Sequence, residues 1–263
     1  YKNNDKISEE INKAKAHKPV YNVFAHDGSN HKIWIVNNKD QIEQMLSEIN
    51  SMDSLFIADG HHRSAAAARV KEKFSKKNLN HDGNEDYNYF LAVAFPHSEM
   101  TILDYNRIIK GLNGQTINSL ISSIEKNYSV KKHSEEFKPA TKNTFGMYID
   151  KNWYELNAIK ENINLNDPVK SLDVSILHDT IIEPLLGIYD ERTDPRIDFV
   201  GGARGLKELE NRVNNDNFDI AFALFPTPIE ALIDVAEANK VMPPKSTWFE
   251  PKLLDGLLSH LIN

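Results

Sequence analysis

The sequence contains no cysteine, and this absence removes several kinds of chemistry. Disulfide bonds, thiolate nucleophiles and cysteine-ligated metal centres are all excluded. A chain that forms no disulfides fits a reducing compartment, and we therefore expect a cytoplasmic protein.

Long hydrophobic runs and an excess of positive charge are also missing. No apolar stretch approaches the roughly 20 residues that a membrane-spanning helix needs, and no signal peptide is visible. The chain starts at Tyr1 in a polar stretch, so we expect a fragment or a processed form. Its 31 basic and 38 acidic residues give a net charge of −7. This charge argues against non-specific binding to nucleic acid or to a membrane surface. The sequence leaves the oligomeric state open.

The 263 residues suffice for one large domain or two small ones. Apolar periodicity predicts helices and strands that alternate with hairpins, which indicates an α/β protein whose mixed sheet is flanked by helices. We expect a weak boundary near residue 110, with parts 1–110 and 111–263 packed as one unit. The expected helices are 1–18, 39–51, 63–74, 116–127, 171–188 (interior ending at Pro184), one from 206, and 229–240. The expected strands include 54–58, 89–96, 144–150, 153–159, 197–200 and 219–225.

The stretch FIADGHHRSAAAARV, residues 56–70, holds the densest polar cluster. A buried strand is expected to enter, Asp59-Gly60 to turn the chain, and a helix to leave. The first turn of a helix offers free N–H groups and a positive dipole end, which suit an anion. Arg63 adds a bidentate donor for phosphate or carboxylate, and His61 and His62 can donate to phosphate oxygens or shuttle a proton.

Simpler roles are open for the same residues. Asp59 is also a typical helix N-cap, and Arg63 a typical partner in a surface ion pair. A zinc site is disfavoured, because adjacent histidines on a helix point about 100° apart and the chain has no HExxH spacing.

Two further stretches carry glycines, cations and hydroxyls. DPRIDFVGGARGLKELE, residues 194–209, predicts strand, glycine turn and helix, with Gly201, Gly202 and Arg204 at the turn. VMPPKSTWFEPKL, residues 241–253, offers Lys245, Ser246 and Thr247 to a phosphate. A tight turn and a capped loop explain these two stretches equally well, since neither has the spacing of a dinucleotide or Walker A motif.

Two other basic residues, Arg107 and Lys110, follow an expected strand in ILDYNRIIKGL. Basic residues in such a place usually form a solvated rim. Scattered histidines such as His178 receive no role from the sequence.

Together, IADGHHR, IDFVGGARG and MPPKSTWFEPKL resemble an uncharacterised prokaryotic family described as a domain of unknown function, and this family is similar to the ParB/sulfiredoxin-like superfamily. The resemblance extends over essentially the whole chain. It implies a ParB/sulfiredoxin-like nucleotide-binding core in 1–110 and a further mixed α/β portion in 111–263. Members of the family are usually longer at the N-terminus, so we expect that portion to be absent here.

Within the superfamily, sulfiredoxins carry a Gly-Cys-His-Arg motif, and His61 stands in place of its cysteine. Sulfiredoxin chemistry is therefore excluded. The motif resembles most closely the Asp-Gly-His version of the free serine kinases, whose catalytic glutamate we do not place in this chain.

The resemblance implies a nucleotide- or phosphate-dependent small-molecule kinase, with free L-serine as a candidate acceptor. The donor would be ATP, ADP or another phosphoryl compound with Mg²⁺. The alternatives are a nucleotide-binding regulatory or hydrolase module, or a non-catalytic protein. The expected catalytic residues are Asp59, His61 and His62, with Asp59 also as the metal ligand. The expected phosphate- or nucleotide-binding residues are Gly60, Arg63, Ser64, Gly201, Gly202, Arg204, Lys245, Ser246 and Thr247.

Overall fold

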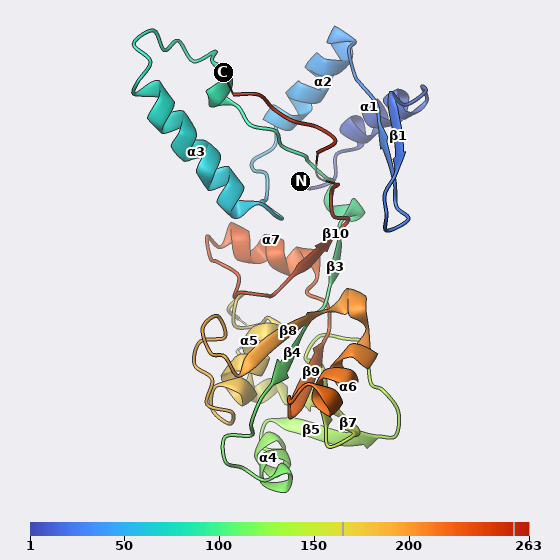
Figure 1. Cartoon of the computed structure of the whole chain (residues 1–263), viewed down its shortest axis with the longest axis vertical. Coiled ribbons are helices and arrows are strands. Elements are labelled where there is room, and N and C mark those ends of the chain that lie inside the picture. The colour runs from blue at the N-terminus through green and yellow to red at the C-terminus, as the bar shows by residue number, and fades with distance from the viewer. Residues whose placement is uncertain (165, 255, 263) are drawn as a thin grey trace. The chain divides into compact units, whose positions relative to one another are not determined.

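The computed structural model describes residues 1–164, 166–254 and 256–262, and the chain divides into two compact units. Unit 1 comprises Tyr1–Met100 together with Pro251–Asn263, and unit 2 comprises Thr101–Glu250. Both units contain helices and strands (Figure 1), so the predicted mixed α/β class is confirmed. None of the helices within the described ranges is long and apolar enough to cross a membrane.

This division differs from the expected parts in two places. Residues 101–110 form strands that pair within unit 2, and the tail from Pro251 onward belongs to unit 1. Strand pairing and the return of a chain end are long-range events. Local composition gives no sign of either.

Unit 1 contains helices, one hairpin and long connecting segments. Side-chain caps fix the start of two helices: Asn4 accepts the N–H of Ile7 at 3.2 Å, and Asn38 accepts the N–H of Gln41 at 3.0 Å. The elements are α1 (Asp5–Lys15), β1 (Tyr21–Phe24), β2 (Asn30–Ile33), α2 (Lys39–Asn50), α3 (His61–Ser75) and the 3₁₀ turns η1 (Asp86–Asn88) and η2 (His97–Glu99). The predicted helices 39–51 and 63–74 are thereby confirmed.

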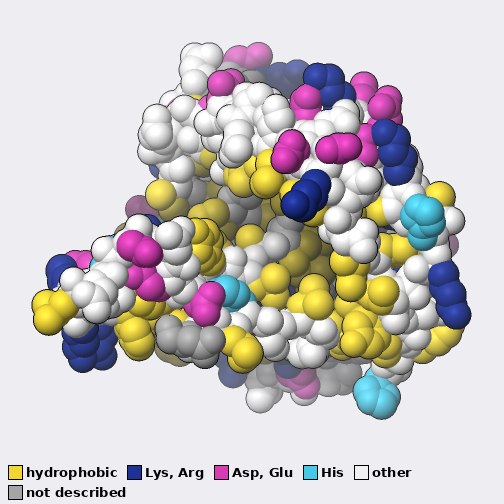
Figure 2. All heavy atoms as spheres, turned by 90° about the horizontal axis from the view of Figure 1, so that it is seen from above, with side chains coloured by type: hydrophobic (Ala, Val, Ile, Leu, Met, Phe, Trp, Pro, Cys, Tyr) yellow, Lys and Arg dark blue, Asp and Glu magenta, His cyan; other side chains and the backbone are white. Residues whose placement is uncertain are grey.

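Two strands predicted in unit 1, 54–58 and 89–96, are wrong. Both segments lack a ladder partner in the described part of the chain, and their apolar side chains remain exposed, with Leu55 at 57% and Phe90 at 55%. Hydrophobic side chains accordingly reach the surface between charged ones (Figure 2). An apolar run predicts extended chain, but only a neighbouring strand makes it part of a sheet.

Unit 2 is built on a six-stranded sheet with strand order β5-β7-β6-β9-β4-β8. Each described pair of neighbours in it is antiparallel, where the sequence had indicated a mixed sheet. A two-stranded sheet of β3 and β10 accompanies it. The strands are β3 (Thr101–Leu103), β4 (Tyr105–Ile109), β5 (Tyr128–His133), β6 (Thr144–Ile149), β7 (Asn152–Ala158), β8 (Ile197–Gly201), β9 (Ile220–Leu224) and β10 (Trp248–Glu250).

Alternating side chains give the six-stranded sheet two apolar faces. In β9, Phe222 and Leu224 join a large core, whereas Ala221 and Ala223 face a smaller cluster with Leu209. The small alanines allow the helix that carries Leu209 to lie close to the sheet. The helices and turns of unit 2 are α4 (Ile117–Ile124), η3 (Lys160–Asn162), α5 (Asp173–Leu177), η4 (His178–Ile182), η5 (Gly202–Arg204), α6 (Leu206–Asn215) and α7 (Ile229–Glu237).

The helix expected in 171–188 changes its winding at His178. Its first part, α5, is α-helical, and η4 is a π-helix in which the N–H of Glu183 donates to the carbonyl of His178 at 2.9 Å. Pro184 has no N–H to donate to Thr180, so an α-helical turn cannot continue there. π-Turns are rare and occur frequently at functional sites.

Candidate functional site

The Asp59-Gly60 turn starts α3 as the sequence predicts. Gly60 is the N-cap residue and adopts φ 85° and ψ 24°, a left-handed conformation that glycine reaches without strain. Its N–H donates to Asp59 Oδ1 at 2.7 Å. Asp59 therefore holds the turn in place rather than capping the helix with its side chain.

A lysine far along the chain contacts the same aspartate. Lys252 Nζ lies 3.2 Å from Asp59 Oδ2. This hydrogen bond, and next the backbone bond from Gly60, hold the pKa of Asp59 below its usual range. Asp59 is therefore ionised at neutral pH, as a metal ligand or a proton acceptor must be. Lys252 was absent from the predicted site.

Arg63 lies over the turn. Its Nη2 is 3.9 Å from Asp59 Oδ1, and a Cβ on Gly60 would come within 3.2 Å of that same nitrogen. The Arg63 side chain is 77% exposed, so its guanidinium is open to a ligand. The ion pair named from the sequence is present, and binding of phosphate by Arg63 stays a prediction.

The first turn of α3 leaves hydrogen-bond donors free. The N–H of Ser64 donates to the carbonyl of Gly60 at 2.9 Å. The N–H groups of His61, His62 and Arg63 have no acceptor among the described residues. Both imidazoles are exposed, and Ser64 is half-buried. The start of α3 thus presents three N–H groups, two imidazoles and a guanidinium.

In the second stretch, glycine is required for close approach. A Cβ on Gly201 would lie 2.6 Å from the Trp248 ring, and one on Gly202 would lie 2.2 Å from an oxygen of the Asp104 carboxylate. Gly202 N–H also donates to the carbonyl of Asp104 at 2.8 Å. Arg204 is 63% exposed and lies 3.6 Å from Glu208. These contacts favour the tight-turn interpretation of this stretch.

The third stretch offers fewer free groups than expected. The Ser246 hydroxyl is buried and donates to the carbonyl of Pro243 at 2.6 Å, so its proton is engaged within the loop. Lys245 is exposed, and its Nζ lies 5.4 Å from the centre of the Tyr105 ring. Thr247 is half-buried.

Tyr105 connects the second and third stretches within unit 2. It pairs with Gly201 in the sheet, and its ring lies 5.6 Å from that of Trp248. Arg63 belongs to unit 1, whereas Arg204 and Lys245 belong to unit 2. The convergence of all three stretches therefore stays a prediction.

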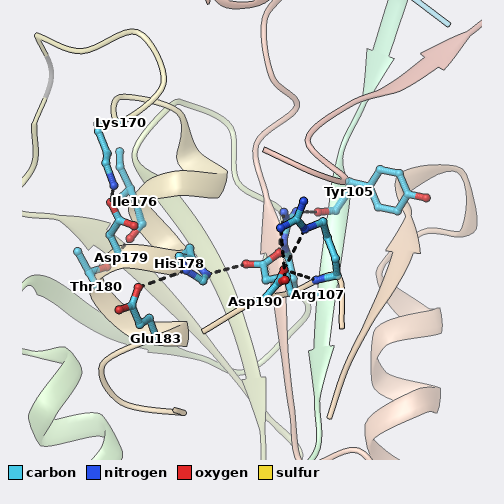
Figure 3. Close-up of polar contacts among 11 residues, drawn as sticks. Tyr105, Arg107, Lys170, Ile176, His178, Asp179, Thr180, Glu183 and Asp190 are labelled. Atoms are coloured by element: carbon cyan, nitrogen blue, oxygen red, sulfur yellow. Dashed lines mark hydrogen bonds and ion pairs between the residues drawn. The ribbon is translucent and has the colours of Figure 1, made fainter. Parts of the chain in front are cut away.

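Figure 3 shows a polar cluster of unit 2 that no motif of the sequence predicts. Arg107, expected at a solvated rim, is only 1% exposed, and its Nη2 lies 3.4 Å from Glu191 Oε2. His178 Nδ1 lies 3.1 Å from Glu191 Oε1, and this hydrogen bond raises the pKa of His178. The only available signal was an arginine inside the apolar strand pattern of β4.

His178 is also part of a group with metal-ligand spacing. One ligand atom each of His178, Asp179 and Glu183 lies within 4.8 Å of the others. Amino-acid partners already occupy all three: Lys170 Nζ lies 2.6 Å from Asp179, and His178 Nε2 lies 3.4 Å from Glu183. The group is held together by these ion pairs.

Comparison with solved structures finds proteins of low similarity. A conserved hypothetical protein from Pyrococcus furiosus is 15% identical, covers 86% of each chain and has a TM-score of 0.40. A free serine kinase in complex with AMP is 14% identical over 81% of each chain, with a TM-score of 0.39. A variant of free serine kinase in complex with ADP is 18% identical, covers 76% of this chain and 69% of the other, and has a TM-score of 0.37.

Comparison with curated protein sequences finds no match. The sequence model of one family, described as "Protein of unknown function (DUF1015)", matches residues 1–175, and the chain therefore belongs to the DUF1015 family.

Proposed function

We propose that this protein is a nucleotide- or phosphate-dependent small-molecule kinase whose phosphate site is the start of α3. The observation that carries the proposal is that the first turn of this helix has N–H groups without an acceptor next to the exposed guanidinium of Arg63. The N–H groups of His61, His62 and Arg63 have no acceptor among the described residues, and Arg63 is 77% exposed. Such a helix end attracts phosphate through its N–H groups and its dipole.

The charges near α3 fit a phosphate oxyanion. Arg63 supplies a planar donor for two oxygens, and Lys252 supplies a compact cation. His61 and His62 are exposed and can donate to further phosphate oxygens. Gly60 lets a ligand approach the backbone because it has no side chain.

Asp59 is the residue that would hold Mg²⁺. Its ionised carboxylate is the hard oxygen donor that Mg²⁺ prefers, and one or two carboxylates together with substrate phosphates are the usual ligands. In phosphoryl transfer the ion neutralises charge on the phosphates. Lys252 occupies Asp59 Oδ2 in the structure, so this lysine would have to turn away, toward the phosphate, when Asp59 takes a cation.

The acceptor we propose is a small hydroxyl compound such as free L-serine. Its oxygen forms the new P–O bond, the bond between the donor's leaving oxygen and phosphorus breaks, and the hydroxyl proton passes to Asp59 or to one of the neighbouring imidazoles. Phosphoryl transfer depends mainly on positioning and charge neutralisation, which are the capacities of this helix end. Gly201, Gly202, Arg204, Lys245, Ser246 and Thr247 remain proposed only as a second phosphate-binding region.

The test is binding followed by turnover. Isothermal titration of the chain with ADP, ATP and pyrophosphate, with and without Mg²⁺, measures the phosphate site. Arg63→Gln is expected to weaken binding at least tenfold. Arg69→Gln, an exposed arginine farther along α3, is the matched control and should bind as the parent does. Equal affinities in the two variants would refute the proposed phosphate site.

Phosphoserine formation from serine and ATP or ADP then tests the reaction. Asp59→Asn keeps the size of the side chain and should abolish the product. Nucleotide binding without any phosphorylated product would favour the alternative of a regulatory or hydrolase module, and release of inorganic phosphate separates those two.

A further inference from the structure

Unit 2 contains a cavity of about 370 Å³ that the proposed kinase site does not use. It lies between strand β4, the α5–η4 helix, the segment 189–192 and the loop that precedes Lys245. A cavity of this size falls in the range of small-molecule sites. All of its lining residues belong to unit 2, so it is complete without unit 1.

The cavity wall includes three charged or titratable side chains of low exposure, beside the buried Val174 and Ser175. The side chains of Arg107, Glu191 and His178 are 1%, 7% and 22% exposed. Those of Arg192 and Tyr189 are far more exposed and mark the mouth. The wall thus has a charged inner end and an open outer end.

The inner end carries more positive than negative charge. Both ring nitrogens of His178 face carboxylate oxygens, Nδ1 toward Glu191 at 3.1 Å and Nε2 toward Glu183 at 3.4 Å. Both nitrogens can donate only when the ring is protonated. With Arg107, the inner end then has two cations against the single buried carboxylate of Glu191, because Glu183 is half-exposed and is not part of the cavity wall.

The guanidinium of Arg107 is incompletely paired. One nitrogen donates to the carbonyl of Tyr105, and Nη2 reaches Glu191 only at 3.4 Å. Its Nε is buried and has no hydrogen-bond partner among the described residues. A buried donor without a partner is costly, and more so on a charged group. Arg107 therefore keeps positive charge that its two partners only partly balance, and it lines the cavity.

The two ion pairs at the outer end of the cavity carry no net charge. Lys170 pairs with Asp179 at 2.6 Å, and Arg192 pairs with Asp190 at 3.0 Å. The uncharged part of the wall is mostly apolar, formed by Val169, Val174, Pro243 and Pro244 together with Ser175. A ligand that fits has one negative charge at its inner end and an apolar body.

We infer that this cavity binds a small organic monocarboxylate, with its carboxylate at Arg107 and His178 and its apolar body against the valines and prolines. A planar carboxylate matches the guanidinium fork, and its single charge balances the surplus at the inner end. A phosphate dianion would add a second negative charge beside Glu191. The π-turn that begins at His178 places the imidazole on this wall, and such turns are frequent at functional sites.

The test is titration of the full chain with acetate, isobutyrate, isovalerate and benzoate, each compared with its neutral amide and with inorganic phosphate. At least one carboxylate should bind saturably, and its amide should bind at least tenfold more weakly. His178→Gln should weaken that binding at least fivefold. Lys207→Gln, an exposed cation of unit 2 outside the cavity, should leave it unchanged.

Two results would overturn the inference: no saturable binding by any of the four carboxylates, or amides that bind as well as acids. Arg63→Gln separates this site from the proposed phosphate site. It should weaken pyrophosphate binding at least tenfold without affecting carboxylate binding. The two sites can therefore fail independently of each other. Arg107→Lys is a second variant, which retains the buried charge but loses the planar fork, and it should also weaken carboxylate binding.

Discussion

Lys252 and Asp59 are 193 positions apart in the sequence, and their side chains are in contact, with Nζ 3.2 Å from Oδ2. The tail that follows unit 2 therefore supplies a cation to the turn that starts α3. Asp59 has two cations near it, Lys252 and Arg63, and is the anionic centre of the proposed phosphate site. A phosphate would compete with Asp59 for both.

Replacing Lys252 separates its contribution to binding from its contribution to stability. The side chains of Lys252 and Asp59 are about half exposed, and an exposed ion pair typically contributes 0–1 kcal/mol. Lys252→Gln should therefore change the free energy of unfolding by less than about 1 kcal/mol and weaken pyrophosphate binding severalfold. Lys71→Gln on the exposed surface of α3 is the control. If both variants bind pyrophosphate equally, Lys252 has no part in the site.

The local part of the proposed site was predictable from the sequence. Asp59-Gly60 followed by an alanine-rich run predicts a turn and a helix start, and both are present with Gly60 left-handed. Lys252 was not predictable, because its contact depends on where a chain end returns. The same limit explains the two missing strands of unit 1, where apolar pattern predicts extended chain but not a neighbour to pair with.

Gly202 tests whether the second stretch needs glycine for packing. A Cβ there would lie 2.2 Å from Asp104 Oδ1, and the Asp104 carboxylate is buried and fixed by Asn106 at 2.5 Å. Gly202→Ala should lower the free energy of unfolding by about 2 kcal/mol, in the range of other overpacked sites. Ala203→Ser adds one atom at the exposed position next to Gly202 and should change the free energy of unfolding little. Urea unfolding measures both variants.

In a double-mutant cycle, Asp104→Ala should recover part of the loss caused by Gly202→Ala, because it removes the oxygen that the new Cβ meets. Additive losses in the cycle would show that the close approach is not the cause.

The variant Glu191→Gln tests the buried ion pair between Arg107 and Glu191. Removing one partner of a buried pair typically costs 3–5 kcal/mol because the other charge stays buried and unpaired. Glu191→Gln should therefore destabilise the protein by about 3 kcal/mol, whereas Arg192→Gln, which breaks an exposed pair at the next position, should change stability by less than about 1 kcal/mol. If both variants lose equally little stability, water screens the charge of Arg107.

The same variant tests the histidine. The hydrogen bond to Glu191 is the largest cause of the raised pKa of His178, and Glu191→Gln should lower that pKa. Titration of the imidazole by NMR measures it. The raised pKa also means that His178 stabilises the fold at pH values below its unfolded pKa, near 6.5, and that this contribution is lost as the pH rises through the folded value. An unchanged pKa in the variant would place the cause elsewhere.

The burial of Arg107 was not predictable from the sequence. Arg107 stands between Asn106 and Ile108 in a strand, and a basic residue near a strand end is usually solvated. Its burial depends on Glu191 and Phe199, which lie more than 80 positions later in the sequence. The guanidinium carbon of Arg107 lies 5.4 Å from the centre of the Phe199 ring. An arginine becomes identifiable as buried only when its distant carboxylate is known.

The buried carboxyl group of Asp173 should make the stability of the protein depend on pH. Its carboxyl group is buried at the start of α5, where Oδ1 accepts the N–H of Asn143 at 2.9 Å and Oδ2 has no partner among the described residues. Burial raises its pKa to about 6, from 3.8 in an exposed carboxyl group. Because the folded pKa is the higher one, stability is greatest below pH 4 as far as this group is concerned. It falls as the pH rises toward 6, by roughly 3 kcal/mol at 1.36 kcal/mol per pKa unit.

Asp173→Asn keeps the shape and the acceptor for Asn143 and removes the charge. It should raise the free energy of unfolding at pH 7 by about 1–2 kcal/mol, less than the full linkage, because the new amide N–H₂ lacks an acceptor. It should have little effect at pH 4. Asp150→Asn, at an exposed hairpin position, is the isosteric control. Urea unfolding at the two pH values measures the difference. An Asp173→Asn variant less stable than the parent at pH 7 would mean that the ionised carboxylate is stabilised where it lies, and that its pKa is not raised.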